Sequence, residues 1–183
     1  MERRGGISGP EARAFQEIFA AEGGRREDPR GAASSGITQG TLDDLIARGK
    51  VGGITSGTRP SQLSPDQRVD VYRGYFEDVM RGVGGSGALA RIGDEDAAAA
   101  FGDTLFRHGR KGGTEAIQRA INGVAPGAVT VDGRIGPATL GAFDRLAHDP
   151  ATRRRLLDAL ADERTKLAPL ERERFDHFRF QRP

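Results

Sequence analysis

The sequence predicts a mainly α-helical fold, and three features of the chain carry this prediction. Apolar residues recur at three- and four-residue spacing along most segments. Helix-start patterns, of which Ser64-Pro65-Asp66-Gln67 is the clearest, precede several of these segments. Only Val129-Thr130-Val131 has a convincing extended pattern. The length of 183 residues fits a first region at 1–93 and a second region at 94–183 that pack together as one globule.

The first expected helix begins at about residue 10, where Ser8-Gly9-Pro10-Glu11 forms a capping box with proline in the first turn. Ile18 and Phe19 lie on its apolar face, and Gly23-Gly24 ends it. Glu22 falls on the last turn, at the edge of the apolar face. Desolvation at such a position raises the pKa of a carboxyl group, as a general acid requires. An exposed glutamate at a helix end is the plainer alternative.

Two further helices are expected in the first region. A short helix begins at Thr41 and turns Leu42, Leu45 and Ile46 inward. Residues 50–63 are rich in glycine, serine, threonine and proline and should form a loop. A longer helix follows the capping box at 64–67, and the glycines at 82–87 end it. The expected apolar face of this helix comprises Val69, Tyr72, Phe76, Val79 and Met80.

The second region is also expected to be helical. One helix starts at Asp94, a second is capped by Thr114, and a third opens with Pro137. The alanines of the first of these permit close helix packing at the centre of the core. A last helix or helix pair covers about 150–180, is interrupted at Pro169, and carries the Arg153-Arg154-Arg155 run on a solvated face.

Composition excludes several kinds of site. The chain has no cysteine, so neither disulfides nor thiolate metal sites contribute. His108, His148 and His177 lie far apart without ligand spacing, so we expect no metal and no other cofactor. A net charge of +2 gives no strong footprint for nucleic acid, although a mildly basic protein still favours anionic polymers. No stretch approaches the length needed to span a bilayer, and residues 1–7 lack the apolar core of a secretory signal.

Four motifs occur in an order that resembles glycoside hydrolase family 108. The first combines Glu22-Gly23-Gly24, Asp28-Pro29 and Gly36-Ile37-Thr38-Gln39, and the second is Val71-Tyr72-Arg73-Gly74-Tyr75-Phe76. The third joins Asp103-Thr104-Leu105-Phe106-Arg107-His108-Gly109 to Ala116-Ile117-Gln118-Arg119-Ala120-Ile121-Asn122, and the fourth is Val131-Asp132-Gly133-Arg134-Ile135-Gly136-Pro137-Ala138-Thr139-Leu140. The similarity spans about residues 12–145. It implies a lysozyme-like helical fold, a small peptidoglycan-binding helical subdomain in the second region, and N-acetylmuramidase activity.

The resemblance also implies roles for individual residues. Glu22 would protonate the leaving oxygen of the β-1,4 link between N-acetylmuramic acid and N-acetylglucosamine. Thr38 would orient the attacking water, and Asp28 would help to position water or substrate. Asp132-Gly133 and Thr139 belong to a segment that packs near glycan in similar modules. From the residues alone, Asp28 equally initiates a turn, Thr38 equally caps a helix, and Asp132-Gly133 equally forms a tight turn.

The chain departs from the family pattern in one loop. Arg25 stands where the family usually has tyrosine, and the loop at 28–35 is shorter and lacks a second Asp-Pro. The second carboxylate of the site therefore has no assigned position, and a catalytically degenerate peptidoglycan-binding protein is an alternative. A helical nucleic-acid binder that uses Arg25, Arg26 and the arginines at 153–155 is a further alternative, against which the near-balanced charge argues.

The expected partner is peptidoglycan, with neither a nucleic-acid partner nor membrane insertion. Because residues 1–7 do not form a secretory signal, we expect synthesis in the bacterial cytoplasm and action at the cell wall or periplasm. A holin, a secretion machinery or carriage on a phage-like particle would supply the route, and the sequence does not choose among them.

Overall fold

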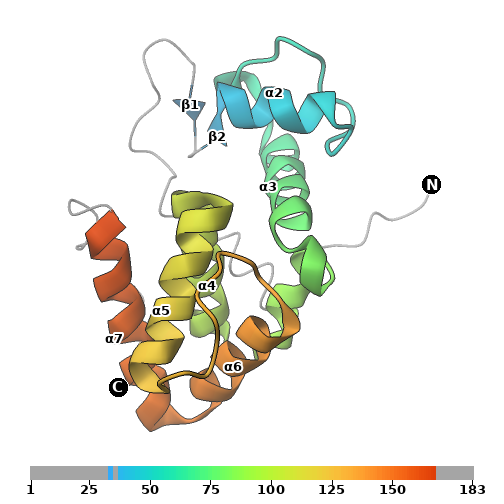
Figure 1. Ribbon diagram of the computed structural model, residues 1–183. Helices are drawn as coiled ribbons and strands as arrows, with labels where there is room; N and C mark the ends of the chain where they lie inside the picture. Colours follow the sequence, from blue (N-terminus) through green and yellow to red (C-terminus); the bar gives the residue numbers. More distant parts are fainter. Residues whose placement is uncertain (1–32, 35–36, 168–183) are drawn as a thin grey trace.

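Figure 1 shows the computed structural model, which describes residues 33–34 and 37–167. Within these ranges the protein is mainly helical, as predicted. The α-helices are α2 (Gln39–Ala47), α3 (Pro65–Val79), α4 (Glu95–His108), α5 (Thr114–Val124), α6 (Pro137–His148) and α7 (Pro150–Leu167). The 3-10 turns η1 (Pro60–Gln62), η2 (Arg81–Val83) and η3 (Ser86–Arg91) and the π-helical turn η4 (Gly109–Gly113) lie between them.

A short antiparallel ribbon precedes α2. It consists of β1 (Ala33–Ser34) and β2 (Ile37–Thr38), with Ala33 opposite Thr38 and Ser34 opposite Ile37. The predicted helix at about 10–22, the interruption at Pro169 and the chain beyond residue 167 lie outside the described residues. Within the described ranges, none of the helices combines the length and the apolar character that crossing a membrane would require.

The predicted start of α3 is confirmed in detail. The Ser64 hydroxyl accepts a hydrogen bond from the backbone N–H of Gln67 at 3.2 Å, and the Gln67 side chain accepts one from the backbone N–H of Ser64 at 2.9 Å. Tyr72 and Phe76 are fully buried, as expected, whereas Val69 is only half-buried and Val71 is buried instead. Because α2, η2 and η3 all pack against α3, its buried surface is wider than one apolar stripe.

Helix α4 lies at the centre of the core. Residues 97–105 are all buried, and α5, α7 and η3 pack around them (Figure 1). Asp94 caps the helix by accepting a hydrogen bond from the N–H of Ala97 at 2.8 Å. Gly113, at the end of η4, comes so close to α4 that a Cβ there would lie 2.7 Å from the carbonyl oxygen of Thr104. The close approach of α4 and α5 therefore depends on small residues.

Two local predictions in the second region are wrong. Thr114 does not cap a helix, because the chain is already helical in η4 and the Thr114 hydroxyl donates back to the carbonyl of Arg110. The segment at 129–131 is not a strand, because the side chain of Asn122 takes the place of a neighbouring strand. Its amide donates to the Val129 carbonyl at 2.8 Å, and its oxygen accepts from the Val129 N–H at 3.1 Å.

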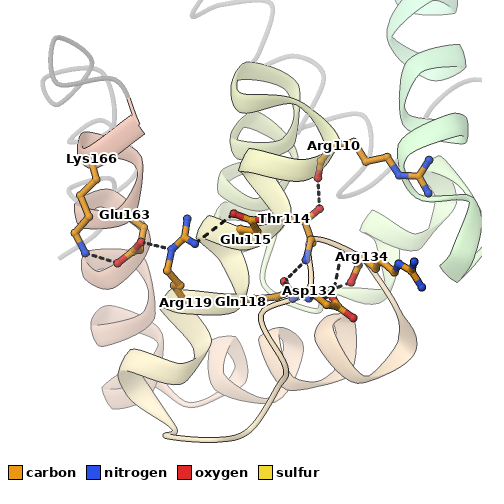
Figure 2. Close-up of polar contacts among 10 residues, drawn as sticks. Arg110, Thr114, Glu115, Gln118, Arg119, Asp132, Arg134, Glu163 and Lys166 are labelled. Atoms are coloured by element: carbon orange, nitrogen blue, oxygen red, sulfur yellow. Dashed lines mark hydrogen bonds and ion pairs between the residues drawn. The ribbon is translucent and has the colours of Figure 1, made fainter.

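Charged side chains bind α7 to its neighbours. Arg119 on α5 bridges Glu115 at 3.5 Å and Glu163 on α7 at 2.7 Å, and Lys166 also pairs with Glu163 (Figure 2). Burial raises the pKa of Glu163, but hydrogen bonds from Lys166 and Arg119 outweigh burial and hold this pKa below its ordinary value.

The predicted solvated face at 153–155 needs a correction at its first residue. Arg153 pairs with Asp94 at 2.8 Å and with Asp96 at 3.0 Å, at the start of α4. The arginine run therefore contributes a structural contact between α7 and α4, and its first guanidinium is compensated by two carboxylates.

The innermost contact between α7 and α4 is an ion pair. Arg164 donates to the carboxylate of Asp103 at 2.7 Å, and the two side chains are 2% and 0% exposed. Arg107, one turn after Asp103, lies 3.5 Å from the same carboxylate. A buried carboxylate without such partners would carry a large desolvation cost.

We predict that Arg164→Met lowers the free energy of unfolding by about 3 kcal/mol, because Asp103 then stays buried without its main partner. Urea denaturation measures the change. The double variant Arg164→Met with Asp103→Leu should recover most of the loss, since apolar pairs often replace buried ion pairs at little cost. A double variant as unstable as the single one would contradict this account.

Candidate functional site

A pocket of about 690 Å³ opens where α2, α3, α4 and η4 meet. Its wall combines residues from both predicted regions, because it includes residues 38–79 of the first region and residues 106–110 of the second. The described residues that line it are Thr38, Gly40, Thr41, Asp44, Leu45, Arg48, Tyr75, Asp78, Val79, Phe106, Arg107, Gly109 and Arg110.

Thr38 is the one predicted catalytic residue within the described part, and it lines this pocket. It ends β2 and caps α2, with its hydroxyl accepting from the backbone N–H of Thr41 at 3.2 Å. The hydroxyls of Thr38 and Thr41 are 3.0 Å apart, so two hydroxyl groups stand together at the pocket wall. Glu22 and Asp28 lie outside the described residues.

A network of ion pairs joins α2 to α3 along the same wall. Arg48 pairs with Asp44 one turn earlier and with Asp78 on α3 at 2.8 Å. Arg81 reaches Asp78 from the other side at 2.5 Å. The hydrogen bond from Arg48, followed by the charges of Arg48, Arg81 and Arg110, holds the pKa of Asp78 below its ordinary value. Asp78 therefore stays ionised and is unsuited to donating a proton near neutral pH.

Two aromatic rings supply the apolar part of the wall. Tyr75 and Phe106 meet edge to face, with ring centroids 5.6 Å apart, and Tyr75 donates its hydroxyl proton to the carbonyl of Leu105 at 3.0 Å. Burial, and then the charge of Asp78, raise the pKa of Tyr75 to about 12. The phenol thus keeps its proton, and the hydrogen bond fixes the ring against α4.

The predicted glycan-contacting residues lie elsewhere, in a turn bound to α5. Gln118 is 1% exposed, and its amide donates to the carboxylate of Asp132 at 2.8 Å (Figure 2). The same amide donates to the hydroxyl of Thr139 at 3.3 Å. Its oxygen accepts from the backbone N–H groups of Asp132 and Gly133 at 3.0 and 2.9 Å. Gly133 has φ of +69°, which favours glycine in a tight turn. One buried amide therefore organises all three residues.

The three residues differ in their access to solvent. Thr139 is 4% exposed and Gly133 is buried, whereas the side chain of Asp132 is exposed. The hydrogen bond from Gln118, and then the one from the Arg134 N–H, lower the pKa of Asp132, so its carboxylate is ionised. Of the three, Asp132 is the residue that can present a side chain to a ligand.

The pocket wall combines charged side chains, two hydroxyl groups and two aromatic rings. This combination suits a polar ligand with apolar faces. Both described carboxylates in the pocket, Asp44 and Asp78, are paired with Arg48. Of these two, Asp78 is held ionised by its ion pairs. Within those residues, no three histidine or carboxylate side chains gather as a metal site.

Most residues that line the pocket have no sequence pattern that indicates a functional role. Arg48 follows Asp44 by four residues, and Tyr75 precedes Asp78 by three, so each pair shares a helix face. Neither spacing distinguishes a pocket wall from an ordinary solvated surface. Gln118 lies in the third motif of the resemblance but received no role there, because its role depends on a turn 14 residues further along the chain.

We predict that Gln118→Leu lowers the free energy of unfolding by about 2–4 kcal/mol, because it leaves two backbone N–H groups without an acceptor. Thr139→Val removes one weaker hydrogen bond and should cost about 1 kcal/mol. Thermal and urea denaturation of both variants test this order. Equal, small losses would mean that Gln118 does not organise the turn.

We predict a pH-dependent contribution from Asp78. Its folded pKa lies below the unfolded value of about 4, so its ion pairs stabilise the fold fully above that pH and lose this effect as the pH falls through the folded pKa. The stability gap between wild type and Asp78→Asn should therefore narrow below about pH 4. Urea denaturation across this range measures the gap, with Asp162→Asn on the exposed side of α7 as the matched control. A gap of constant size would contradict the prediction.

No protein-family model matches the sequence, and no curated protein matches it significantly.

Proposed function

We propose that this chain is a peptidoglycan hydrolase with a lysozyme-like fold, which cleaves the β-1,4 link between N-acetylmuramic acid and N-acetylglucosamine. The observation that carries the proposal is that Thr38, which belongs to the same motif as Glu22 and Asp28, lines a pocket of about 690 Å³. Thr38 of this motif thus lies on a concave surface, and ligand sites are usually found on such surfaces.

The chemistry of the wall is consistent with a glycan. The rings of Tyr75 and Phe106 offer an apolar surface on which the flat face of a sugar can pack. Thr38 and Thr41 add hydroxyls that can donate to or accept from sugar hydroxyls and water. In the proposed reaction, Glu22 protonates the leaving oxygen while an oxocarbenium-like state develops, and Thr38 holds the attacking water.

Asp28 would assist in positioning water or substrate, since Arg48 engages both described carboxylates of the pocket. In the second region, we propose that Asp132 contacts the polymer through its exposed carboxylate. Gly133 and Thr139 would act indirectly, through the turn that Gln118 holds in place. The protein would act at the bacterial cell wall, reached by a secretion machinery or a phage-like particle.

Two observations favour the alternative of a peptidoglycan-binding protein without catalysis. The pocket's described carboxylates are both ion-paired, and the loop at 28–35 is shorter than in family 108 and lacks its second Asp-Pro. If Glu22 does not act as an acid, the same pocket and the Asp132 turn would still form a binding surface.

We predict that Glu22→Gln abolishes the release of reducing ends from purified peptidoglycan, because glutamine cannot protonate the leaving oxygen. Circular dichroism should show an unchanged fold. Glu27→Gln, five residues further along, is the matched control and should retain activity. Hydrolysis at the wild-type rate by Glu22→Gln would overturn the proposed mechanism. Sedimentation with cell walls without any bond cleavage by the wild type would favour the binding protein.

A further inference from the structure

The charges of the pocket are unevenly compensated. Arg48 lies between two carboxylates, and the largely buried Arg107 lies 3.5 Å from Asp103. Arg110 also lines the pocket, is exposed, and makes no ion pair with any other described residue. Among the described residues, the edge of the pocket formed by η4 therefore carries a guanidinium that has no ion-pair partner.

The backbone of Arg110 is held by a hydrogen bond to the next helix. Its carbonyl oxygen accepts a hydrogen bond from the Thr114 hydroxyl at 2.5 Å, which ties η4 to the start of α5. Figure 2 shows the Arg110 side chain directed away from the Gln118 cluster, toward α3. Its charge contributes, after those of Arg48 and Arg81, to the lowered pKa of Asp78, which agrees with that direction.

We propose that Arg110 binds a carboxylate of the glycan substrate and so makes the pocket selective for acidic over neutral sugar polymers. This inference rests on the proposed function. A guanidinium group presents paired N–H donors that match the two oxygens of a carboxylate. The rings of Tyr75 and Phe106 would pack against the sugar ring, and Arg110 would bind its acidic substituent.

Lys111 is a second positive charge on the same turn that lies outside the pocket lining. It is the next residue of η4 and carries the same charge, but it does not line the pocket. The side chain of Lys111 instead packs beside Gly133, where a Cβ built on the glycine would lie 3.2 Å from Cγ of Lys111. Lys111→Gln is therefore a matched control for Arg110→Gln, because it removes one positive charge from the same turn.

Peptidoglycan offers a carboxylate from two sources. In strands that carry stem peptides, the lactyl group is amidated and the free carboxylates belong to the peptide. In peptide-free strands, the lactyl carboxylate itself is exposed. Neutral chitin oligosaccharides have the same type of sugar backbone without either carboxylate.

The test titrates these three ligands into the full-length chain carrying Glu22→Gln, with and without Arg110→Gln or Lys111→Gln. Arg110→Gln should weaken binding of one acidic ligand about tenfold and leave chitin binding unchanged, because only the charge-assisted contact is lost. A loss confined to peptide-bearing strands assigns the contact to the peptide, and a loss confined to peptide-free strands assigns it to the lactyl group. Lys111→Gln should bind all three like its parent, and Arg110→Lys should restore part of the loss.

Three results would overturn the inference: undiminished binding by Arg110→Gln, an equal loss for chitin, or an equal loss in Lys111→Gln. Failure of the proposed function would look different. In that case the wild type would release no reducing ends from peptidoglycan, or Glu22→Gln would still release them, whatever the effect of Arg110.

Discussion

The structure depends on a helix that is buried on all sides and yet carries a carboxylate. Residues 97–105 of α4 have no exposed member, so Asp103 has to be neutralised from within the core. Arg164 does this from α7, and the resulting pair fixes α7 against α4 at one position along both helices. Because α5 and α6 pack on α7, the same contact orients them. The C-terminal end of α4 then brings Phe106 and Arg107 to the pocket.

Features encoded by neighbouring residues could be predicted from the sequence. The capping box at Ser64 and the proline that opens α6 are local signals, and both proved correct. The extended pattern at 129–131 failed because its hydrogen-bonding partner is the side chain of Asn122, which no periodicity reveals. The prediction that Thr114 caps a helix was wrong for a related reason. A capping residue must follow a non-helical segment, but residues 109–113 are already helical.

The turn at 132–133 shows why a motif does not by itself identify a ligand. Its residues resemble a glycan-contacting segment, but Gly133 is explained by a positive φ and Thr139 by a hydrogen bond to Gln118. Any protein with this turn on this helix needs much the same residues. The exposed carboxylate of Asp132 is left as the part of the motif whose exposure permits contact with a ligand. The fold was therefore easier to infer from these residues than the site.

The ion pairs of the pocket bear directly on whether a carboxylic acid could work there. A guanidinium about 4 Å away lowers the pKa of a carboxyl group, since such an attraction is worth about 4 kcal/mol near a protein surface. Three arginines would thus oppose the raised pKa that a general acid needs. Asp44 and Asp78 compensate Arg48, and Asp103 partly compensates Arg107. Arg110 makes no ion pair with another described residue, and a substrate carboxylate bound to it would neutralise its charge. Under the proposed function, substrate binding would thus remove one of the charges that oppose a protonated acid in this pocket.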